Sequence, residues 1–408
     1  MIKPINYFLL TLIVFIYFLF PMAKAVGAFG SLFLLIVGVF FFLKDLRGNL
    51  IPRGVVIASF PFIALFLLSL VGALYGMAAT QEKIDYILKS LRYLVIFFGA
   101  HFLFRLNFFG VALQSFSVSM AVTLAMVYMS VVFVLPWAPH VPQTWGGDHT
   151  IWGDYITQNI MMSFFAIWML HQAFEGTRKE IKALYFILFA LASIAVLALS
   201  YGRTGYVMLI TAFLGYCFLS LKYWRWRILV CLMVVASVFV LYFWVDAFHS
   251  RVNQAYIEFL TTDKKNLTSI GARLLMWETA LEIGWNNFWW GVGSGSYAAE
   301  WCGIVEELSW CGVGQHPHNH FLLLFASNGI FAFLLYSFLI LSGVFLIFKK
   351  HTKSHLLLFV YLSILLVDSL LNGPFWNIRE ANFFTLIGAV VLAMIFREIT
   401  QHPTKDIE

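Results

Sequence analysis

The sequence predicts an all-α, polytopic integral membrane protein of about twelve transmembrane helices, with one large extramembrane loop between helices nine and ten. Of its 408 residues, 62% are hydrophobic and only 11% are charged, and the mean hydropathy is +0.86. Soluble domains average about 25% charged residues, so a water-soluble globule is excluded. Apolar runs of roughly 17–25 residues recur along the chain, and each is long enough to cross a bilayer as a helix.

Twelve apolar runs account for the predicted transmembrane helices. The first run begins almost at Met1 and has no small-residue cleavage site, which favours a first helix over a removed signal peptide. This predicts nine helices in 1–245, the loop in 246–318, three helices in 319–396 and a tail in 397–408. The runs are 5–20, 28–43, 54–75, 86–104, 108–135, 155–174, 181–199, 204–221, 227–245, 319–348, 355–371 and 381–396.

Lysine and arginine gather at alternate connections between these runs. By the positive-inside rule those connections are cytoplasmic, as are both termini, including Lys3 and Lys405. The opposite connections hold Lys24, no Lys or Arg in 136–154, and Arg379, so 246–318 is predicted to be extracytoplasmic. These basic loops account for most of the net charge of +6, and no nucleic-acid partner is needed to explain it. The basic residues are Lys44, Arg47, Arg53, Arg105, Arg178, Lys179, Lys182, Lys222, Arg225, Arg227, Lys349, Lys350 and Lys353.

The four cysteines divide into two pairs. Cys217 and Cys231 fall inside apolar runs, where packing explains them. Cys302 and Cys311 share the external loop, where an oxidising compartment would allow a disulfide. Two free buried thiols remain the alternative.

A helix is predicted within the external loop over 267–285. Thr268 or Ser269 can cap its start, and an apolar stripe with two tryptophans suits a helix lying in the membrane interface. Arg273 beside the stripe would be held at headgroup depth, or would snorkel to water as a surface residue. The stripe consists of Ile270, Leu274, Trp277, Leu281 and Trp285.

Three glycines follow this helix, at 291, 293 and 295. They permit a tight turn with close backbone approach. The Gly-Lys-Ser/Thr ending of a phosphate-binding loop is missing, and no strand–turn–helix unit surrounds the segment, so neither nucleotide motif applies. A structural turn is the favoured interpretation.

Two charges lie at or inside the predicted bilayer. Arg203 occupies the short turn 200–205 between two apolar runs. An unpaired charge there costs about 2.5–3.5 kcal/mol, so Arg203 is a functional candidate, with a snorkelling anchor as the alternative. Asp368 is the acidic residue well inside an apolar run, and it could pair with Arg203, with His318 or with neither.

A histidine cluster marks the point where the hydrophilic segment re-enters the membrane, in Gln315-His-Pro-His-Asn-His320. Alternate side chains of an extended segment share a face, which would suit a metal. However, Asn319 is a good helix cap, so His320 is predicted to belong to the helix, and no carboxylate pair or cysteine completes a site. No metal site is therefore predicted. His318 is the candidate general base, because the usual histidine pKa of about 6.5 lets it accept a proton near neutrality.

His318-Asn319, followed by nine residues and Gly329, resembles the His-Asn/Ser/Gln-x9-Gly signature of the O-antigen ligases, within a superfamily of bacterial polysaccharide ligases and polymerases. The resemblance extends to 267–274, to the turn around Arg203, to the glycine-rich segment 288–297 and to the whole topology. One departure is Val207, where the family pattern Arg-x3-Leu has leucine.

This resemblance implies metal-independent, inverting glycosyl transfer at the periplasmic face of the bacterial inner membrane, without a cofactor. The implied donor is undecaprenyl-diphosphate-linked O-antigen, and the implied acceptor is the lipid A–core oligosaccharide.

The resemblance also implies roles for individual residues. His318 would deprotonate the acceptor hydroxyl, and Arg203 and Arg273 would hold the diphosphate through bidentate hydrogen bonds. The implied supporting residues are Asp368, Asn319, His316 and Arg379.

Three other functions remain open at this stage. An O-antigen polymerase would use the same donor. A protein O-oligosaccharyltransferase is disfavoured, because such chains usually continue into a further periplasmic domain. A transporter or flippase could use Arg203 and Asp368 as a relay, although no inverted repeat is apparent. The glycan repeat, the acceptor sugar and the oligomeric state are not encoded in any recognisable motif.

Overall fold

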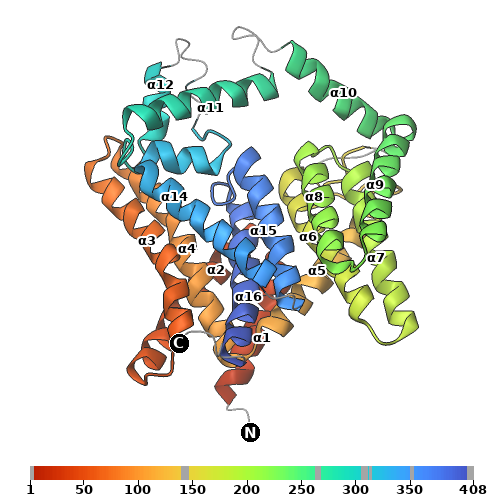
Figure 1. Ribbon diagram of the computed structural model, residues 1–408, viewed down its shortest axis with the longest axis horizontal. Helices are drawn as coiled ribbons and strands as arrows, with labels where there is room; N and C mark the ends of the chain where they lie inside the picture. Colours follow the sequence, from red (N-terminus) through yellow and green to blue (C-terminus); the bar gives the residue numbers. More distant parts are fainter. Residues whose placement is uncertain are drawn as a thin grey trace. The chain divides into compact units, whose positions relative to one another are not determined.

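The computed structural model describes residues 4–138, 147–261, 268–304, 311, 315–349 and 353–401, and its regular structure there is entirely helical (Figure 1). The polar segment 262–267, the tail 402–408 and the basic residues Lys3 and Lys350 lie outside the described residues. The helices are α1 Pro4–Leu19, α2 Lys24–Arg47, α3 Arg53–Tyr75, α4 Thr80–Leu106, α5 Phe109–Ser130, α6 Tyr155–Glu175, α7 Lys179–Ala198, α8 Arg203–Ser220, α9 Trp224–Trp244, α10 Asp246–Leu260, α11 Ser269–Asn286, α12 Tyr297–Ile304, α14 His320–Lys349, α15 Lys353–Leu371 and α16 Ile378–Gln401.

The prediction of an all-α polytopic membrane protein is confirmed. Within the described ranges, ten helices are long and apolar enough to cross a membrane: α2–α5, α7–α9 and α14–α16. The other two of the twelve predicted runs are also helical. α1 is apolar but only 16 residues long, and α6 buries polar side chains that lower its hydropathy, such as Gln158, Asn159 and His171.

In the described part of the segment predicted to be an external loop, three helices lie between α9 and α14. α11 matches the helix that the apolar stripe predicts, and the side chain of Thr268 caps it by accepting from the N–H of Gly271 at 3.1 Å. The sequence did not predict α10 or α12. The described residues also include a disulfide between Cys302 and Cys311, with 4.7 Å between their Cα atoms, which resolves the alternative left open above.

The chain forms two compact units. The first unit comprises Met1–Gly27, Gly110–Ile257 and Ile347–Val367, and the second comprises Ala28–Phe109, Glu258–Leu346 and Asp368–Glu408.

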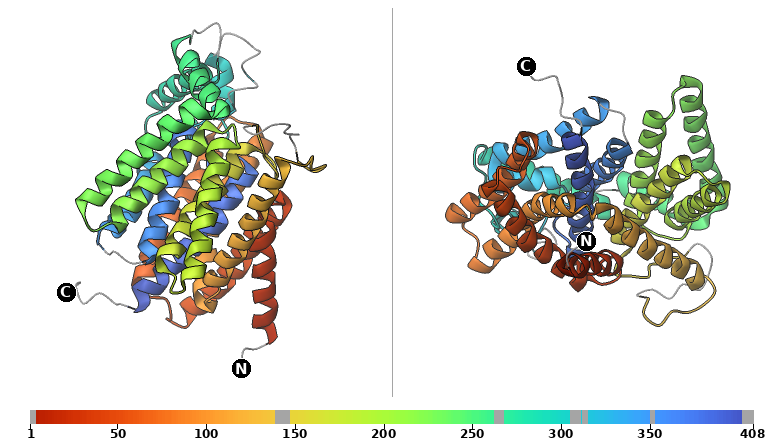
Figure 2. Two further views of the ribbon diagram at one scale, coloured as in Figure 1. Left: turned by 90° about the vertical axis from the view of Figure 1, so that its right-hand side faces the viewer. Right: turned by 90° about the horizontal axis from the view of Figure 1, so that it is seen from below.

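In the first unit, consecutive helices pack side by side. α6 contacts α7 and α8, α7 contacts α8, and α8 contacts α9 (Figure 2). Short connections join these helices, so their direction alternates. The turn at 199–202 therefore lies at the opposite end of the unit from the basic connections 176–178 and 221–223.

In the second unit, α4 is the central helix. α3 and α16 both pack against it (Figure 1). The backbone of α2 approaches α4 so closely that a Cβ at Gly38 would overlap the backbone of Phe98. α4 buries Phe97, Phe102 and Leu103 completely, which makes it the core of this unit.

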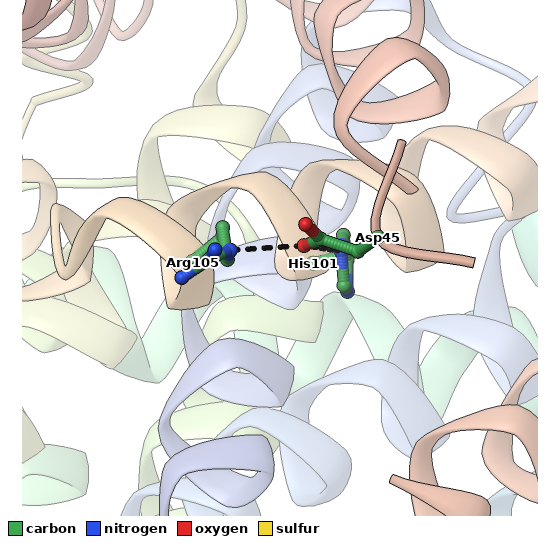
Figure 3. Close-up of polar contacts among 3 residues, drawn as sticks. All are labelled: Asp45, His101 and Arg105. Atoms are coloured by element: carbon green, nitrogen blue, oxygen red, sulfur yellow. Dashed lines mark hydrogen bonds and ion pairs between the residues drawn. The ribbon is translucent and has the colours of Figure 1, made fainter. Parts of the chain in front are cut away.

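An ion cluster around the buried carboxylate of Asp45 joins α2 to α4 and shows their relative direction. Asp45 in α2 lies 3.1 Å from Nε2 of His101 and 3.0 Å from Nε of Arg105, both in α4 (Figure 3). Asp45 and Arg105 stand near the carboxyl ends of their helices, so the two helices run parallel. Arg397, near the end of α16, reaches Asn107 at 3.5 Å, so α16 ends on the same side. The beginnings of α4 and α16 therefore lie at the opposite end of the unit.

We expect Asp45→Asn to destabilise the second unit. The substitution removes the charge that pairs with His101 and Arg105, and a hydrogen bond to a charged group contributes about 1.5–3 kcal/mol. The midpoint of thermal unfolding in detergent should fall by several degrees. Arg47→Gln, at an exposed position in the same helix, is the control and should leave the midpoint unchanged. Equal midpoints for the two variants would contradict this role of Asp45.

Candidate active site at the start of α14

The histidine segment of the second unit is held by a local hydrogen bond. The backbone N–H of His318 donates to Nδ1 of His316 at 2.8 Å. His316 is buried, and its ring lies 4.8 Å from the ring of Trp376 and 5.6 Å from that of His318. His318 has φ of +50°, a left-handed conformation that few residues other than glycine adopt. The buried ring of His316 therefore helps to hold His318 in an unusual backbone conformation.

Asn319 caps α14, as the sequence predicts. Its Oδ1 accepts from the N–H of Leu322 at 3.1 Å, which satisfies one of the N–H groups exposed at a helix start. Its Nδ2 donates to the carbonyl of Leu370 at 3.2 Å, so the cap also ties α14 to the end of α15. His318 consequently lies immediately before the positive end of a helix.

His320 belongs to the helix and faces the core, which confirms the interpretation from capping. It is the first residue of α14, it is buried, and its Nε2 lies 2.7 Å from the hydroxyl of Tyr93. Its ring packs 4.9 Å from Tyr336 and 5.5 Å from Phe375. Across the described part of the chain, no three His, Cys, Asp or Glu side chains are arranged to hold a metal ion.

Arg273 is linked to Asp368 through a residue that the sequence did not reveal. Nη2 of Arg273 donates to Oδ1 of Asn372 at 3.4 Å. Nδ2 of Asn372 in turn donates to Oδ1 of Asp368 at 3.0 Å, and Asp368 is completely buried. Asp368 thus supports Arg273 through Asn372, a connection that the sequence did not predict.

The surroundings of His318 keep its ring neutral. Burial and the nearby positive charge of Arg273 lower the pKa of His318 to about 4. Burial, followed by the charges of His318, His320 and Lys89, lowers the pKa of His316 well below its ordinary value. Both imidazoles are therefore neutral near pH 7, and a neutral imidazole can accept a proton.

The remaining predicted residue of the second unit, Arg379, lies at the start of α16. It is half-buried, and its backbone N–H donates to Oδ1 of Asn377 at 3.1 Å.

The glycine-rich segment is a structural turn that locks onto α14. The N–H groups of Val292 and Gly293 donate to the carbonyls of Ala326 and Ser327, each at 2.9 Å. The N–H of Ile330 donates to the carbonyl of Phe288 at 2.9 Å. These contacts are made where α14 is kinked at Gly329.

Gly329 is required at the kink for two reasons. Its φ of +74° is disfavoured for residues with a Cβ. A Cβ at this position would also overlap the carbonyl group of Trp289. Gly329, the glycine of the His-Asn-x9-Gly pattern, is therefore needed for the close packing of α14 against the backbone of Trp289.

The apolar stripe of α11 points away from the packed side of the helix. Leu274 and Leu281 are each 42% exposed and Trp285 is 65% exposed, whereas Met276, Ala280 and Ile283 form the buried face. This is the exposure that a helix lying in the membrane interface would have. Contact with lipid remains a prediction.

Arg203 lies in the first unit, at the first position of α8. It is half-buried, and the turn before it is held by Asn159 of α6. Nδ2 of Asn159 donates to Oγ of Ser200 at 2.9 Å and to the carbonyl of Gly202 at 3.3 Å. A Cβ at Gly205 would overlap Asn159, so the turn and α6 are tightly packed.

Other polar groups of the first unit, which were not predicted from the sequence, gather at this turn. The guanidinium of Arg251 lies 4.2 Å from the ring centroid of Tyr201. Asp148 and His149 are buried, and the N–H of His149 donates to the carbonyl of Leu199 at 3.0 Å. Residues from α10 and from the segment before α6 thus surround the start of α8.

Residues 188–337 match the model of the family described as O-antigen ligase. The match covers a little over a third of the chain and supports a relationship to that family. The matched range contains Arg203, Arg273, His318 and Gly329, and ends before Asp368. No match to a curated protein was found. The matched segment supports a ligase- or polymerase-type transfer of lipid-linked glycan in a membrane.

We expect Gly329→Ala to lower stability and to disturb the site, because the backbone at φ of +74° and ψ of −171° is essentially restricted to glycine, costs about 1–3 kcal/mol for other residues, and the new Cβ overlaps Trp289. Gly110→Ala is the matched control, since no atom lies within 4 Å of the added Cβ. Thermal unfolding in detergent should separate the two variants. Equal midpoints would show that α14 tolerates a side chain at the kink.

We also expect Arg273→Gln to raise the pKa of His318 towards its ordinary value of about 6.5, because a neighbouring positive charge is removed. The measurement is the pH dependence of carbethoxylation at His318 by diethyl pyrocarbonate, read by mass spectrometry, since the reagent modifies the neutral ring. Arg379→Gln should leave the profile unchanged. Identical profiles for wild type and Arg273→Gln would exclude this electrostatic coupling.

Proposed function

We propose that the protein is an O-antigen ligase that transfers undecaprenyl-diphosphate-linked O-antigen to the lipid A–core oligosaccharide. The observation that carries the proposal is a neutral, half-buried His318 beside Arg273 at the start of a membrane-spanning helix. A neutral base and a fixed cation are the two groups that sugar transfer from a diphosphate requires.

The proposed reaction is a single displacement. The acceptor hydroxyl attacks the anomeric carbon of the donor, and its proton passes to His318. The bond between that carbon and the diphosphate oxygen breaks, and the electron pair leaves on the diphosphate. Attack opposite to the leaving group inverts the configuration. Arg273 would stabilise the departing charge through bidentate hydrogen bonds.

Donor binding would also strengthen the base. Burial, and then the charge of Arg273, lowers the pKa of His318 in the free protein. A bound diphosphate would offset that charge and raise the pKa of His318 when the acceptor hydroxyl must be deprotonated. The same arginine would thus keep the base neutral at rest and permit proton uptake during transfer.

Neighbouring residues would position these two groups. His316 would fix the backbone of His318, Asn319 would cap the following helix, and Asp368 would orient Arg273 through Asn372. These contacts support positioning roles, because each one acts through another residue.

Arg203 is proposed as a second ligand of the diphosphate, and Arg379 as a further supporting residue. The proposal for Arg203 rests on its match to the family pattern and on a half-buried charge at a helix start. Two arginines would supply the neutralisation that a divalent cation supplies elsewhere, which makes metal-independent transfer the expected mechanism.

Charge distribution supports a periplasmic site in the bacterial inner membrane. Within the first unit, Arg203 lies at the end opposite to the basic connections around Arg178 and Lys222. Within the second unit, His318 lies at the end opposite to Arg105 and Arg397. By the positive-inside rule, the basic ends are cytoplasmic.

We expect purified wild-type protein to join lipid-linked O-antigen to lipid A–core in the presence of EDTA. His318→Ala should reduce the rate by at least about 100-fold, in the range of losses for a general base. His249→Ala, at an exposed position of α10, is the control and should retain activity.

Each departure from that result has a defined meaning. Product formation by His318→Ala would overturn the base assignment. Loss of activity with EDTA, restored by zinc, would replace the metal-independent mechanism. Growth of lipid-linked chains without any acceptor would identify a polymerase. Movement of intact donor across a vesicle membrane without transfer would favour a flippase.

A further inference from the structure

A pocket that has no role in the mechanism above adjoins the histidine segment through Gln315. Its volume is about 270 Å³, and it lies in the second unit between the first turns of α4 and the beginning of α12. The side chains that give it its chemistry are Glu82, Asp85, Lys89, Ala298, Gln315 and Trp376.

The ring of His316 lies between the wall of the pocket and the proposed base, His318. Gln315 directly precedes His316, and the ring of Trp376 lies 4.8 Å from that of His316. His316 in turn holds the backbone of His318. The wall of the pocket is therefore linked to His318 through Trp376 and His316.

The lining combines the groups that recognise a sugar ring. Glu82 and Asp85 offer exposed carboxylates that accept hydrogen bonds from hydroxyls, while Lys89 and Gln315 offer donors. Trp376 supplies aromatic surface, and the ammonium of Lys89 lies 3.2 Å from its ring centroid. One face of α4 carries Glu82, Asp85 and Lys89, because residues three and seven positions apart point the same way.

The charges that line the pocket indicate which part of the donor or acceptor can bind in it. Two carboxylates at the mouth of the pocket would repel the donor diphosphate. Arg273, the proposed diphosphate ligand, meets the loop after α15 through Asn372, whereas the pocket meets this loop through Trp376. An in-line displacement also needs the acceptor on the side away from the leaving group.

We propose that this pocket binds one uncharged or amino sugar ring of the acceptor glycan, an inference that rests on the proposed function. The volume sets the size of the ligand, since it is below the roughly 300–1,000 Å³ of sites for drug-sized molecules. The pocket holds the acceptor so that its hydroxyl reaches His318.

The test measures binding of delipidated core oligosaccharide to the full protein in nanodiscs by isothermal titration calorimetry. Ala298→Phe fills the pocket and should weaken binding by at least about tenfold, the equivalent of 1.4 kcal/mol. Ala299→Phe, at the exposed neighbouring position, is the control and should bind as the wild type does. Asp85→Asn, an exposed near-isosteric change, should weaken binding several-fold without affecting the fold.

His318→Ala separates the two proposals, because it should bind the oligosaccharide normally while failing to transfer glycan. Unchanged binding in both Ala298→Phe and Asp85→Asn, or no binding by the wild type, would overturn the pocket assignment. If Ala298→Phe or Asp85→Asn raised the KM for the donor but bound the oligosaccharide as the wild type does, the assignment of the pocket to the acceptor would be overturned. Wild-type binding without product would overturn the proposed function and leave the pocket assignment intact.

Discussion

The hydrogen bond from the backbone of His318 to the ring of His316 is the contact on which the candidate site depends. It holds His318 in a left-handed conformation directly before α14, and the side chain of Asn319 caps the start of that helix. The ring of His316 is itself fixed, because Trp376 packs against it and a Cβ at Gly373 would overlap it. A flexible segment would let the imidazole turn away from Arg273. The local bond therefore converts a loop histidine into a preorganised group, and preorganisation is how enzyme sites avoid reorganisation during reaction.

Electrostatics then determines what the positioned histidine can do. Partial burial, and then the positive charge of Arg273, lowers the pKa of His318 and keeps its ring neutral. Asp368 is linked to that arginine through Asn372. A carboxylate buried in a membrane-spanning helix is costly unless it is paired or hydrogen-bonded, so its presence is best explained by a functional requirement. The glycine-rich turn and the kink at Gly329 add rigidity by joining the extramembrane segment to α14 through backbone hydrogen bonds. The contacts that join the glycine-rich turn to α14 are thus hydrogen bonds between uncharged backbone groups.

Much of this organisation follows from local sequence. Apolar runs predicted every long helix, because a bilayer requires about 20 apolar residues per span. Asn319 and Thr268 predicted two helix starts, because capping depends on residues that are close in sequence. The resemblance agrees with the O-antigen ligase model that matches residues 188–337, a range that contains Arg203, Arg273 and His318. Their roles remain proposals. The sequence did not reveal Asn372, which is 99 positions from Arg273, or the packing of Trp376 on His316, because such contacts depend on tertiary structure. It also did not reveal α10, which contains too many polar and charged residues to suggest a membrane span.

A structure of the protein in a lipid nanodisc with undecaprenyl diphosphate bound would test the central claim most directly. We predict that diphosphate oxygens lie within hydrogen-bonding distance of the Arg273 guanidinium, and that the His318 ring faces the bond that is broken in transfer. Asn372 should keep its link between Arg273 and Asp368. A diphosphate bound away from Arg273, or a His318 ring turned towards the protein core in the complex, would contradict the account.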